Sequence, residues 1–235
     1  MDGFLDDARA RWMNGWLSVV LLTLMVGCGE DSGREDTNLD LFKKNVTLEQ
    51  QLSTLADIGL VVNQGVVEED LISFDTRAIL ESKPYRGLVE VMGIELEREP
   101  YAPICDRLWM CDYERIEDHG DYRDVILRLE LMTGVVLALT NVTDYVDVEE
   151  EKAWVEFDFR GRPIHWDFVV ENDWLDPAVL VKYDRLLKGA QSPLRIYSNH
   201  SDYGQVAFLG AFTPEEKSRF DRLTKIKLIL IEKQV

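Results

Sequence analysis

The strongest constraint on how this chain can fold is a pair of stretches with alternating apolar and polar residues, separated by a short turn. Between Trp154 and Val170, apolar and polar residues alternate on both sides of the segment Arg160-Gly161-Arg162-Pro163. Such alternation is typical of strands with one buried face, and a glycine between polar residues is typical of a tight hairpin turn. The sequence therefore predicts a β-hairpin over 154–170, with one face packed against a core.

A two-residue turn at Gly161-Arg162 fixes the register that we expect for this hairpin. With that turn, six apolar residues meet on one face in three pairs: Phe159 with Ile164, Phe157 with Trp166, and Val155 with Phe168. Successive side chains of a strand point to opposite faces, so a correct register should gather the apolar residues on one side. The predicted register meets that requirement.

The opposite face of the hairpin carries residues that could do chemistry. In the same register Asp158 lies opposite His165, and Glu156 lies opposite Asp167. Two opposed carboxylates repel each other, so this face requires either water or a positive charge. Glu156, Asp158, His165 and Asp167 are therefore candidate ligands of a divalent cation, or an acid and base pair. The competing interpretation is a solvated face with a weak surface pair between Asp158 and His165.

A different signal stands near the start of the chain. Residues 16–28 form an uncharged, mostly apolar run of thirteen residues. That run is shorter than the roughly 20 residues of a membrane-spanning helix, but it has the length of the apolar core of a secretory signal. Its end, Leu24-Met25-Val26-Gly27-Cys28, resembles the lipobox of bacterial lipoproteins. The resemblance implies that residues 1–27 are a signal peptide, cleaved before Cys28, and that Cys28 is lipidated.

The segment that follows fits this interpretation. Residues 29–38 contain glycine, serine and five charges but no apolar side chain, so we expect residues 28–39 to be a flexible tether. A lipidated Cys28 would anchor the protein in the bacterial cell envelope through the membrane. The alternative is a buried N-terminal helix, which would leave the protein in the cytoplasm. Met1 and Met13 both remain candidate start residues.

The rest of the chain, residues 40–235, is expected to form a single α+β domain. Residues 40–93 have helical patterns, and residues 104–235 alternate strands with helices. We expect a mixed, mostly antiparallel sheet with helices on one side, preceded by a small N-terminal helical region. The expected helices cover 47–59, 68–80, 84–92, 122–132 and 177–187, and a last helix begins at Thr213. The expected further strands cover 107–113, 135–139, 194–197, 206–212 and 226–231, and an acidic loop covers 144–151.

Two further patterns concern local chemistry. Thr47 and Gln50 fit a helix-capping box, and Thr213-Pro214-Glu215-Glu216 combines a cap, a proline and first-turn acids. Cys105 and Cys111 would lie about 20 Å apart in an extended strand, too far for a disulfide. We therefore expect both thiols to be free and buried.

Charge limits the partners of this protein. The chain has a formal net charge of −18, and residues 1–27, with three Asp and two Arg, account for −1 of it. A surface that carries −17 repels phosphate backbones, so nucleic acid is excluded as a partner and a basic protein is favoured. Phosphate-loop, dinucleotide-binding and nucleophile-elbow motifs are absent from the sequence, and no cofactor is predicted apart from the divalent cation above.

The leading hypothesis is a non-enzymatic, envelope-anchored, acidic binding protein that recognises a basic protein partner. Immunity proteins have a similar size and charge. Trp166, Trp174 and Tyr203 are candidates for its binding surface, although core packing is the plainer use of such residues. The alternative hypothesis is a metal-dependent hydrolase that uses the hairpin residues Glu156, Asp158, His165 and Asp167.

Overall fold

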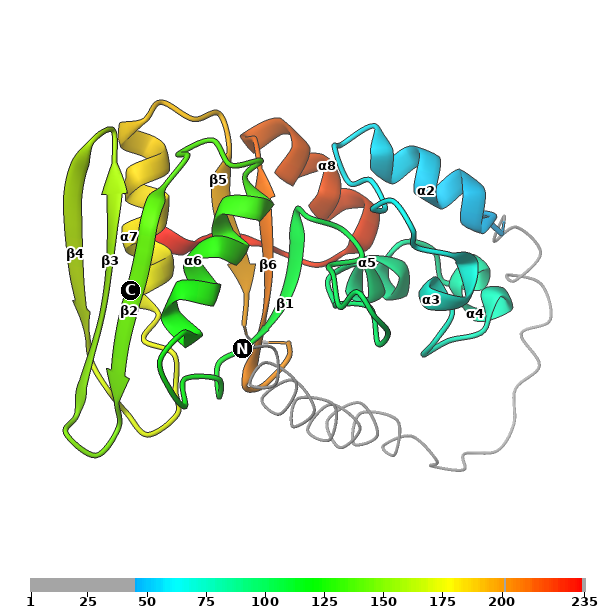
Figure 1. Cartoon of the computed structure of the whole chain (residues 1–235). Coiled ribbons are helices and arrows are strands. Elements are labelled where there is room, and N and C mark those ends of the chain that lie inside the picture. The colour runs from blue at the N-terminus through cyan, green and yellow to red at the C-terminus, as the bar shows by residue number, and fades with distance from the viewer. Residues whose placement is uncertain (1–44, 201, 234–235) are drawn as a thin grey trace, which may run out of the picture. The chain divides into compact units, whose positions relative to one another are not determined.

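A computed structural model describes residues 45–200 and 202–233, within one compact unit that spans Lys43–Val235 (Figure 1). The predicted signal peptide, the tether and Cys28 lie outside the described residues. The predicted α+β class is confirmed. The strands form two separate antiparallel sheets instead of one mixed sheet. Among the described residues, no helix combines the length and apolarity needed to cross a bilayer.

The N-terminal part of the unit is a group of short helices. They are α2 (Leu48–Ala56), α3 (Glu68–Leu71), α4 (Arg77–Ser82) and α5 (Arg86–Met92). The capping box at α2 is confirmed, because Thr47 Oγ1 accepts from Gln50 N–H and the Gln50 side chain accepts from Thr47 N–H. Gln51 is fully buried and donates to the carbonyls of Val46 and Leu80, both at 2.9 Å, which ties α2 to α4.

The prediction of a single helix over 68–80 is wrong. The chain forms α3, then an irregular stretch, then α4. In this stretch Ser73 Oγ donates to the Asp70 carbonyl, and Thr76 Oγ1 accepts from Ile79 N–H to cap α4. Serine and threonine side chains that bond to nearby backbone compete with helical hydrogen bonds, and here they end one helix and start the next.

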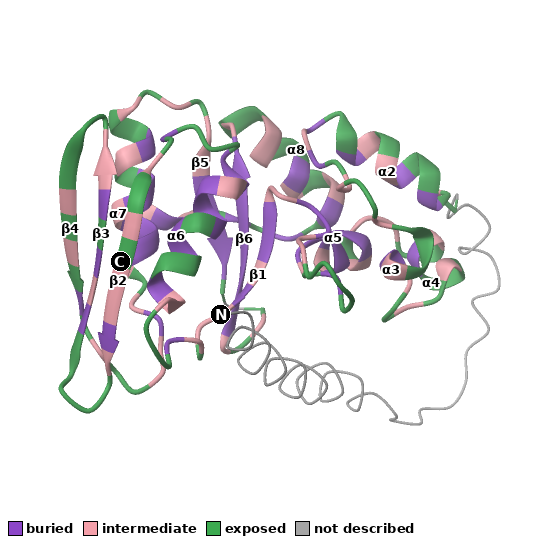
Figure 2. Ribbon diagram, viewed as in Figure 1, coloured by how far each residue is buried: buried purple, intermediate pink, exposed green. Residues whose placement is uncertain are grey.

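The first sheet has four strands in the order β1-β6-β5-β7, all antiparallel. They are β1 (Leu108–Asp112), β5 (Arg195–Asn199), β6 (Val206–Phe212) and β7 (Ile229–Leu230). Only Ile229–Leu230 of the final strand expected over 226–231 is extended in the sheet. Every residue of β6 is buried (Figure 2). Ala207, Leu209 and Ala211 face one core, whereas Phe208 and Phe212 face another.

The second sheet has three antiparallel strands in the order β2-β3-β4. They are β2 (Thr140–Asp147), β3 (Lys152–Phe159) and β4 (Arg162–Phe168). The inner face of this sheet is apolar and joins the first core through Val146, Val155, Phe157 and Phe168. The side chains of the outer face alternate with those of the inner face; they are polar or charged apart from Tyr145, Trp154 and Pro163, and they are exposed or half-buried.

The remaining helices fill the layers beside these sheets. They are α6 (Asp121–Met132), α7 (Ala178–Gly189), α8 (Pro214–Thr224) and the 3₁₀ helix η1 (Ile231–Lys233). Helices α6 and α7 lie between the two sheets, and α8 lies with α2–α5 on the far face of the four-stranded sheet (Figure 1). The expected placement of helices on one side therefore holds for the three-stranded sheet only.

The strand predicted over 135–139 is wrong, and so is part of the acidic loop predicted over 144–151. Val135 and Ala138 have φ of 57° and 50°, and the strand β2 begins at Thr140. A buried carboxylate shapes this segment, because Glu130 accepts from Leu139 N–H at 3.1 Å. Asp144 points inward from β2 and accepts from Gly120 N–H at the start of α6. Asp144 thus belongs to a strand, and its carboxylate caps the N-terminus of α6.

The hairpin between β3 and β4 is confirmed, but its turn is not at Gly161-Arg162. The turn is Arg160-Gly161, with φ of 53° and 72°, which is the conformation of a type I′ turn with its glycine in second place. The register moves by two residues, so Phe157 pairs with Ile164 and Val155 pairs with Trp166. A shift of two residues keeps each side chain on its predicted face, since side chains alternate with a period of two.

Cys105 and Cys111 are both free and buried, as predicted. Burial raises the pKa of both thiols, that of Cys111 to about 11. Neither thiol is therefore a reactive thiolate near neutral pH.

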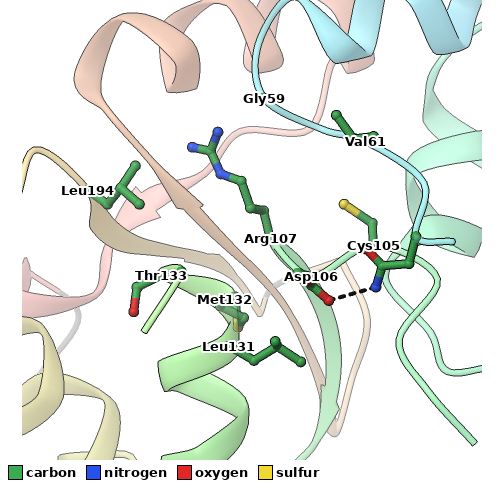
Figure 3. Close-up of a pocket in the computed structure, with 11 residues that line it drawn as sticks. Gly59, Val61, Cys105, Asp106, Arg107, Leu131, Met132, Thr133 and Leu194 are labelled. Atoms are coloured by element: carbon green, nitrogen blue, oxygen red, sulfur yellow. Dashed lines mark hydrogen bonds between the residues drawn. The ribbon is translucent and has the colours of Figure 1, made fainter. Parts of the chain in front are cut away.

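Arg107 joins the helical part to the four-stranded sheet (Figure 3). Its guanidinium forms a two-pronged ion pair with Glu216 of α8, at 2.6 and 3.1 Å, and donates to the carbonyls of Ala211 and Ile58. Gly59 leaves the room for this group. A Cβ at Gly59 would lie 1.7 Å from Arg107 Nη1, and the backbone there has a φ of +78°.

We expect Gly59→Ala to destabilise the protein by more than Gly65→Ala does. Gly65 also has a positive φ, +92°, but a Cβ at this position would meet nothing within 4 Å, so its substitution costs only the backbone strain of about 1–2 kcal/mol. Gly59→Ala must in addition displace the Arg107 guanidinium from Glu216, which costs about 1.5–3 kcal/mol further. Urea unfolding of both variants measures the difference, and equal losses would contradict this account of Arg107.

Candidate functional site

The outer face of the three-stranded sheet is the strongest candidate site. The described helices cover both faces of the four-stranded sheet, but they cover only the inner face of this one. The outer face carries the carboxylates of Asp147, Glu156, Asp158 and Asp167 and the ammonium of Lys152. In Figure 2 the edge strand β4 is mostly exposed, whereas β6 of the other sheet is buried. A large polar face of this kind is accessible to a partner.

His165 lies on this face in the edge strand β4 and bridges two carboxylates. Its Nδ1 lies 2.8 Å from Glu156 Oε1, and its Nε2 lies 3.0 Å from Asp167 Oδ1. The hydrogen bonds, with that to Asp167 the stronger influence and that to Glu156 next, raise the pKa of His165 above its ordinary value. Both ring nitrogens donate when the imidazole is charged, so this geometry favours the cation.

The shifted register explains why these carboxylates do not face each other directly. Glu156 pairs with His165, and Trp154 pairs with Asp167, so the four residues occupy two neighbouring cross-strand pairs. The carboxylates of Glu156 and Asp167 therefore lie on one diagonal of this group of four, and the rings of Trp154 and His165 lie on the other. The predicted opposition of Glu156 and Asp167 is wrong, and so is that of Asp158 and His165, because the turn lies one residue earlier.

Asp158 is held by a different residue. Its Oδ2 accepts from the side-chain amide of Asn141 at 2.7 Å, and its cross-strand partner is Pro163. The structure therefore brings together Glu156, His165 and Asp167 of the predicted set, and directs Asp158 toward β2. Within residues 45–200 and 202–233, no three His, Cys, Asp or Glu side chains are grouped so that they could hold a metal ion.

Aromatic rings continue the site across the sheet. The Trp154 ring lies 5.5 Å from the His165 ring, and Tyr145 of β2 stacks on Trp154 at 6.0 Å. Lys152 places its ammonium 5.4 Å from the Tyr145 ring centre, a cation–π distance. The predicted loop over 144–151 hides Tyr145, whereas Trp154 belongs to the predicted hairpin but is not among the predicted site residues. The alternation of Thr143, Tyr145 and Asp147 is the signal that could have found Tyr145.

The three aromatic residues predicted to form a binding surface lie apart. Trp166 is on the inner face of β4, where its ring meets Phe157 edge-on at 4.8 Å against the first core. Trp174 lies in the loop before α7 and forms a backbone bridge with Glu114. Tyr203 packs against the second core and donates to Glu90 at 2.7 Å. Trp166 and Tyr203 thus serve different cores.

A cavity of about 280 Å³ lies between the loop after α2, the loop before β1 and the end of α6 (Figure 3). Its polar groups are occupied by one another and by backbone. Asn63 donates to Asp106 at 2.6 Å and to the Pro103 carbonyl, and Arg107 holds Glu216. This arrangement is that of a structural junction, whereas the outer face presents exposed charges to solvent.

We expect the pKa of His165, followed by its ring proton shifts in NMR, to lie above the ordinary value of about 6.5. In the Glu156→Gln, Asp167→Asn double variant it should fall toward that value. A raised folded-state pKa means that the bridge stabilises the fold below the unfolded-state pKa and that this contribution is lost as pH rises through the folded-state value. An unchanged midpoint in the double variant would contradict the bridged geometry.

Comparison with known protein families, with curated proteins and with solved structures finds no match for this chain, so its site is interpreted from its own geometry.

Proposed function

We propose that this chain is a non-enzymatic, acidic binding protein that receives a basic protein partner on the outer face of its three-stranded sheet. The observation that carries the proposal is the uncovered face itself. One side of the sheet builds the core, while the other presents four carboxylates beside two half-buried aromatic rings. Carboxylates next to aromatic rings suit a cationic partner by charge complementarity.

The charge of the whole chain supports the same partner. A net charge of −18 attracts basic surfaces and speeds their encounter, while it repels nucleic acid. The turn between β2 and β3 adds Glu149, Glu150 and Glu151, all exposed, at one end of the outer face. An immunity-like protein, which neutralises a basic partner by covering it, would need such a surface.

The proposal includes a location in the bacterial cell envelope. Its basis is the lipobox-like sequence that ends at Cys28, followed by the polar residues up to position 39. Lipid on Cys28 would hold the folded unit near the membrane, and the tether would let the sheet face reach a partner. If the N-terminal segment is not a signal, the same binding function would operate in the cytoplasm.

The alternative is a metal-dependent hydrolase that uses Glu156, Asp158, His165 and Asp167. It requires His165 to offer a lone pair to the ion. In the structure both ring nitrogens lie within hydrogen-bond distance of carboxylates, and Asp158 bonds to Asn141. These contacts support the binding function over the hydrolase.

We expect charge reversal on the outer face to weaken binding of a cationic polypeptide, because it removes the complementary charges. The Glu156→Lys, Asp167→Lys double variant should bind immobilised poly-L-lysine at least about tenfold more weakly than wild type at low salt, and added salt should reduce the wild-type affinity. The matched control is Glu69→Lys with Glu97→Lys, two exposed acids of the helical part with the same total charge change. Equal losses in both double variants would indicate a general charge effect and would refute the sheet face as the site.

We expect the mature protein, purified from a bacterial membrane fraction, to begin at Cys28. Its mass should exceed that of residues 28–235 by two or three acyl chains and a glyceryl group, because lipoproteins of the family that the sequence resembles are modified in this way. Mass spectrometry of the N-terminal peptide measures this directly, and Cys28→Ser should abolish the added mass. An intact Met1 or Met13 in the purified protein would refute the anchor.

A further inference from the structure

We propose that Glu156, Asp167 and the ring of Trp154 form a seat for the guanidinium of a single arginine side chain of the partner, and that His165 occupies this seat in the unbound protein. The inference rests on the proposed function and deepens it, because it names the side chain that is recognised. It also names the residue that must be displaced.

The geometry of the two cross-strand pairs builds the seat. Glu156 and Asp167 lie on adjacent strands and on the same diagonal, so their carboxylates approach one group from two sides. Trp154 lies on the crossing diagonal, and its ring forms the floor beside them. A planar cation placed on this ring would meet a carboxylate at each end, which is the arrangement that a guanidinium uses for stacking and two-sided hydrogen bonding.

His165 already shows this mode of binding. Its imidazole lies 5.5 Å from the Trp154 ring, tilted by 34°, with one nitrogen toward each carboxylate. A charged imidazole has two N–H donors in one plane, and a guanidinium has five. The two groups compete for the same oxygens, so the partner's arginine must displace the His165 ring. That ring is partly exposed and belongs to an edge strand, so it can turn away without disturbing the core.

The neighbouring row of the sheet supports the same chemistry. There, Lys152 lies over the Tyr145 ring at 5.4 Å, and Tyr145 stacks on Trp154. The aromatic floor therefore continues from Trp154 to Tyr145 and already holds one cation of the chain itself. The other charged groups near the seat are Asp147 and Asp158, both acidic, and Lys182 of α7. The Lys182 ammonium lies over the inner-face ring of Trp166 and donates to the backbone carbonyl of Asp167 at 2.9 Å, so it leaves the Asp167 carboxylate to the seat. No cation on the outer face other than Lys152 and His165 opposes an arriving arginine in the described strands.

The exposure of the carboxylates leaves the seat accessible. Glu156 and Asp167 keep 52% and 83% of their side-chain surface exposed, so a partner can reach both. Each exposed ion pair contributes little, and the seat gains its specificity from the combination of two carboxylates and a ring. A lysine ammonium would satisfy the charge but not the planar stacking, so we expect arginine to be preferred.

The test uses the full folded chain and a synthetic Gly-Ser peptide that carries one arginine, with lysine and citrulline versions of the same peptide. Calorimetry should give the order arginine, lysine, citrulline, from tight to undetectable. His165→Asn should bind the arginine peptide about three- to tenfold more tightly than wild type, because it releases both carboxylates. The control His200→Asn changes a histidine of the β5–β6 loop, which stacks on Tyr113, and should leave the affinity unchanged.

Two substitutions of Trp154 distinguish the contribution of its aromatic ring to binding from its contribution to the fold. Trp154→Phe should retain most of the affinity, whereas Trp154→Leu should lose roughly two- to fivefold of it, the amount expected for an exposed cation–π contact. In wild type, the indole signal of Trp154 should shift on titration with the arginine peptide, which tests the contact without any variant. Circular dichroism and thermal melting of each variant check the fold.

The outcomes separate this inference from the proposed function. If the charge-reversal variant loses poly-L-lysine binding but His165→Asn, Trp154→Leu and the Trp154 signal show no effect, the sheet face binds cations and the arginine seat is refuted. If the charge-reversal variant behaves like its control, the proposed function itself is refuted. Equal affinity for the arginine and lysine peptides would also overturn the seat.

Discussion

The burial of β6 on both faces is the constraint on which the rest of the structure depends. Its odd-numbered residues pack against α6 and α7, and its even-numbered phenylalanines pack against α8 and the N-terminal helices. A strand buried on both sides needs a layer on each side, since its apolar side chains would otherwise face water. The two-residue alternation of Val206–Phe212 thus sets the order of the layers.

The layer order in turn explains why the three-stranded sheet has a polar face available for function. Helices α6 and α7 bury their apolar sides against both sheets, so the second sheet needs to supply only its inner face to the core. Its outer face does not pack against another layer, so it can carry charged groups whose burial in the core would cost free energy. The charges of Glu156, His165 and Asp167 are tolerated there because water reaches them.

The sequence predicted best what local chemistry decides. The capping box at Thr47 and the box at Thr213 depend on residues three positions apart, and both are present. The faces of the hairpin were predicted correctly despite the wrong turn, because an error of two residues preserves the alternation. The aromatic floor of the site was missed, since Tyr145 reaches Trp154 only through the pairing of β2 with β3. The junction around Arg107 joins Ile58 to Glu216, and such distant partners leave no periodic pattern in a sequence.

The proline in the edge strand has a consequence for how a partner can approach. Pro163 lies in β4, the outermost strand of its sheet, and a proline has no N–H to donate to a neighbouring strand. The pairs of the hairpin alternate in their hydrogen bonding, and Pro163 falls one position after the bonded pair at the turn, so its ring takes the place of a donor on the open edge. A foreign strand that tried to lengthen the sheet from this end would meet a gap in the ladder. Pro163 thus disfavours self-association by strand addition at this edge, while the outer face of the sheet stays accessible. A partner can then be recognised by side chains without exposing the backbone of the edge strand to aggregation.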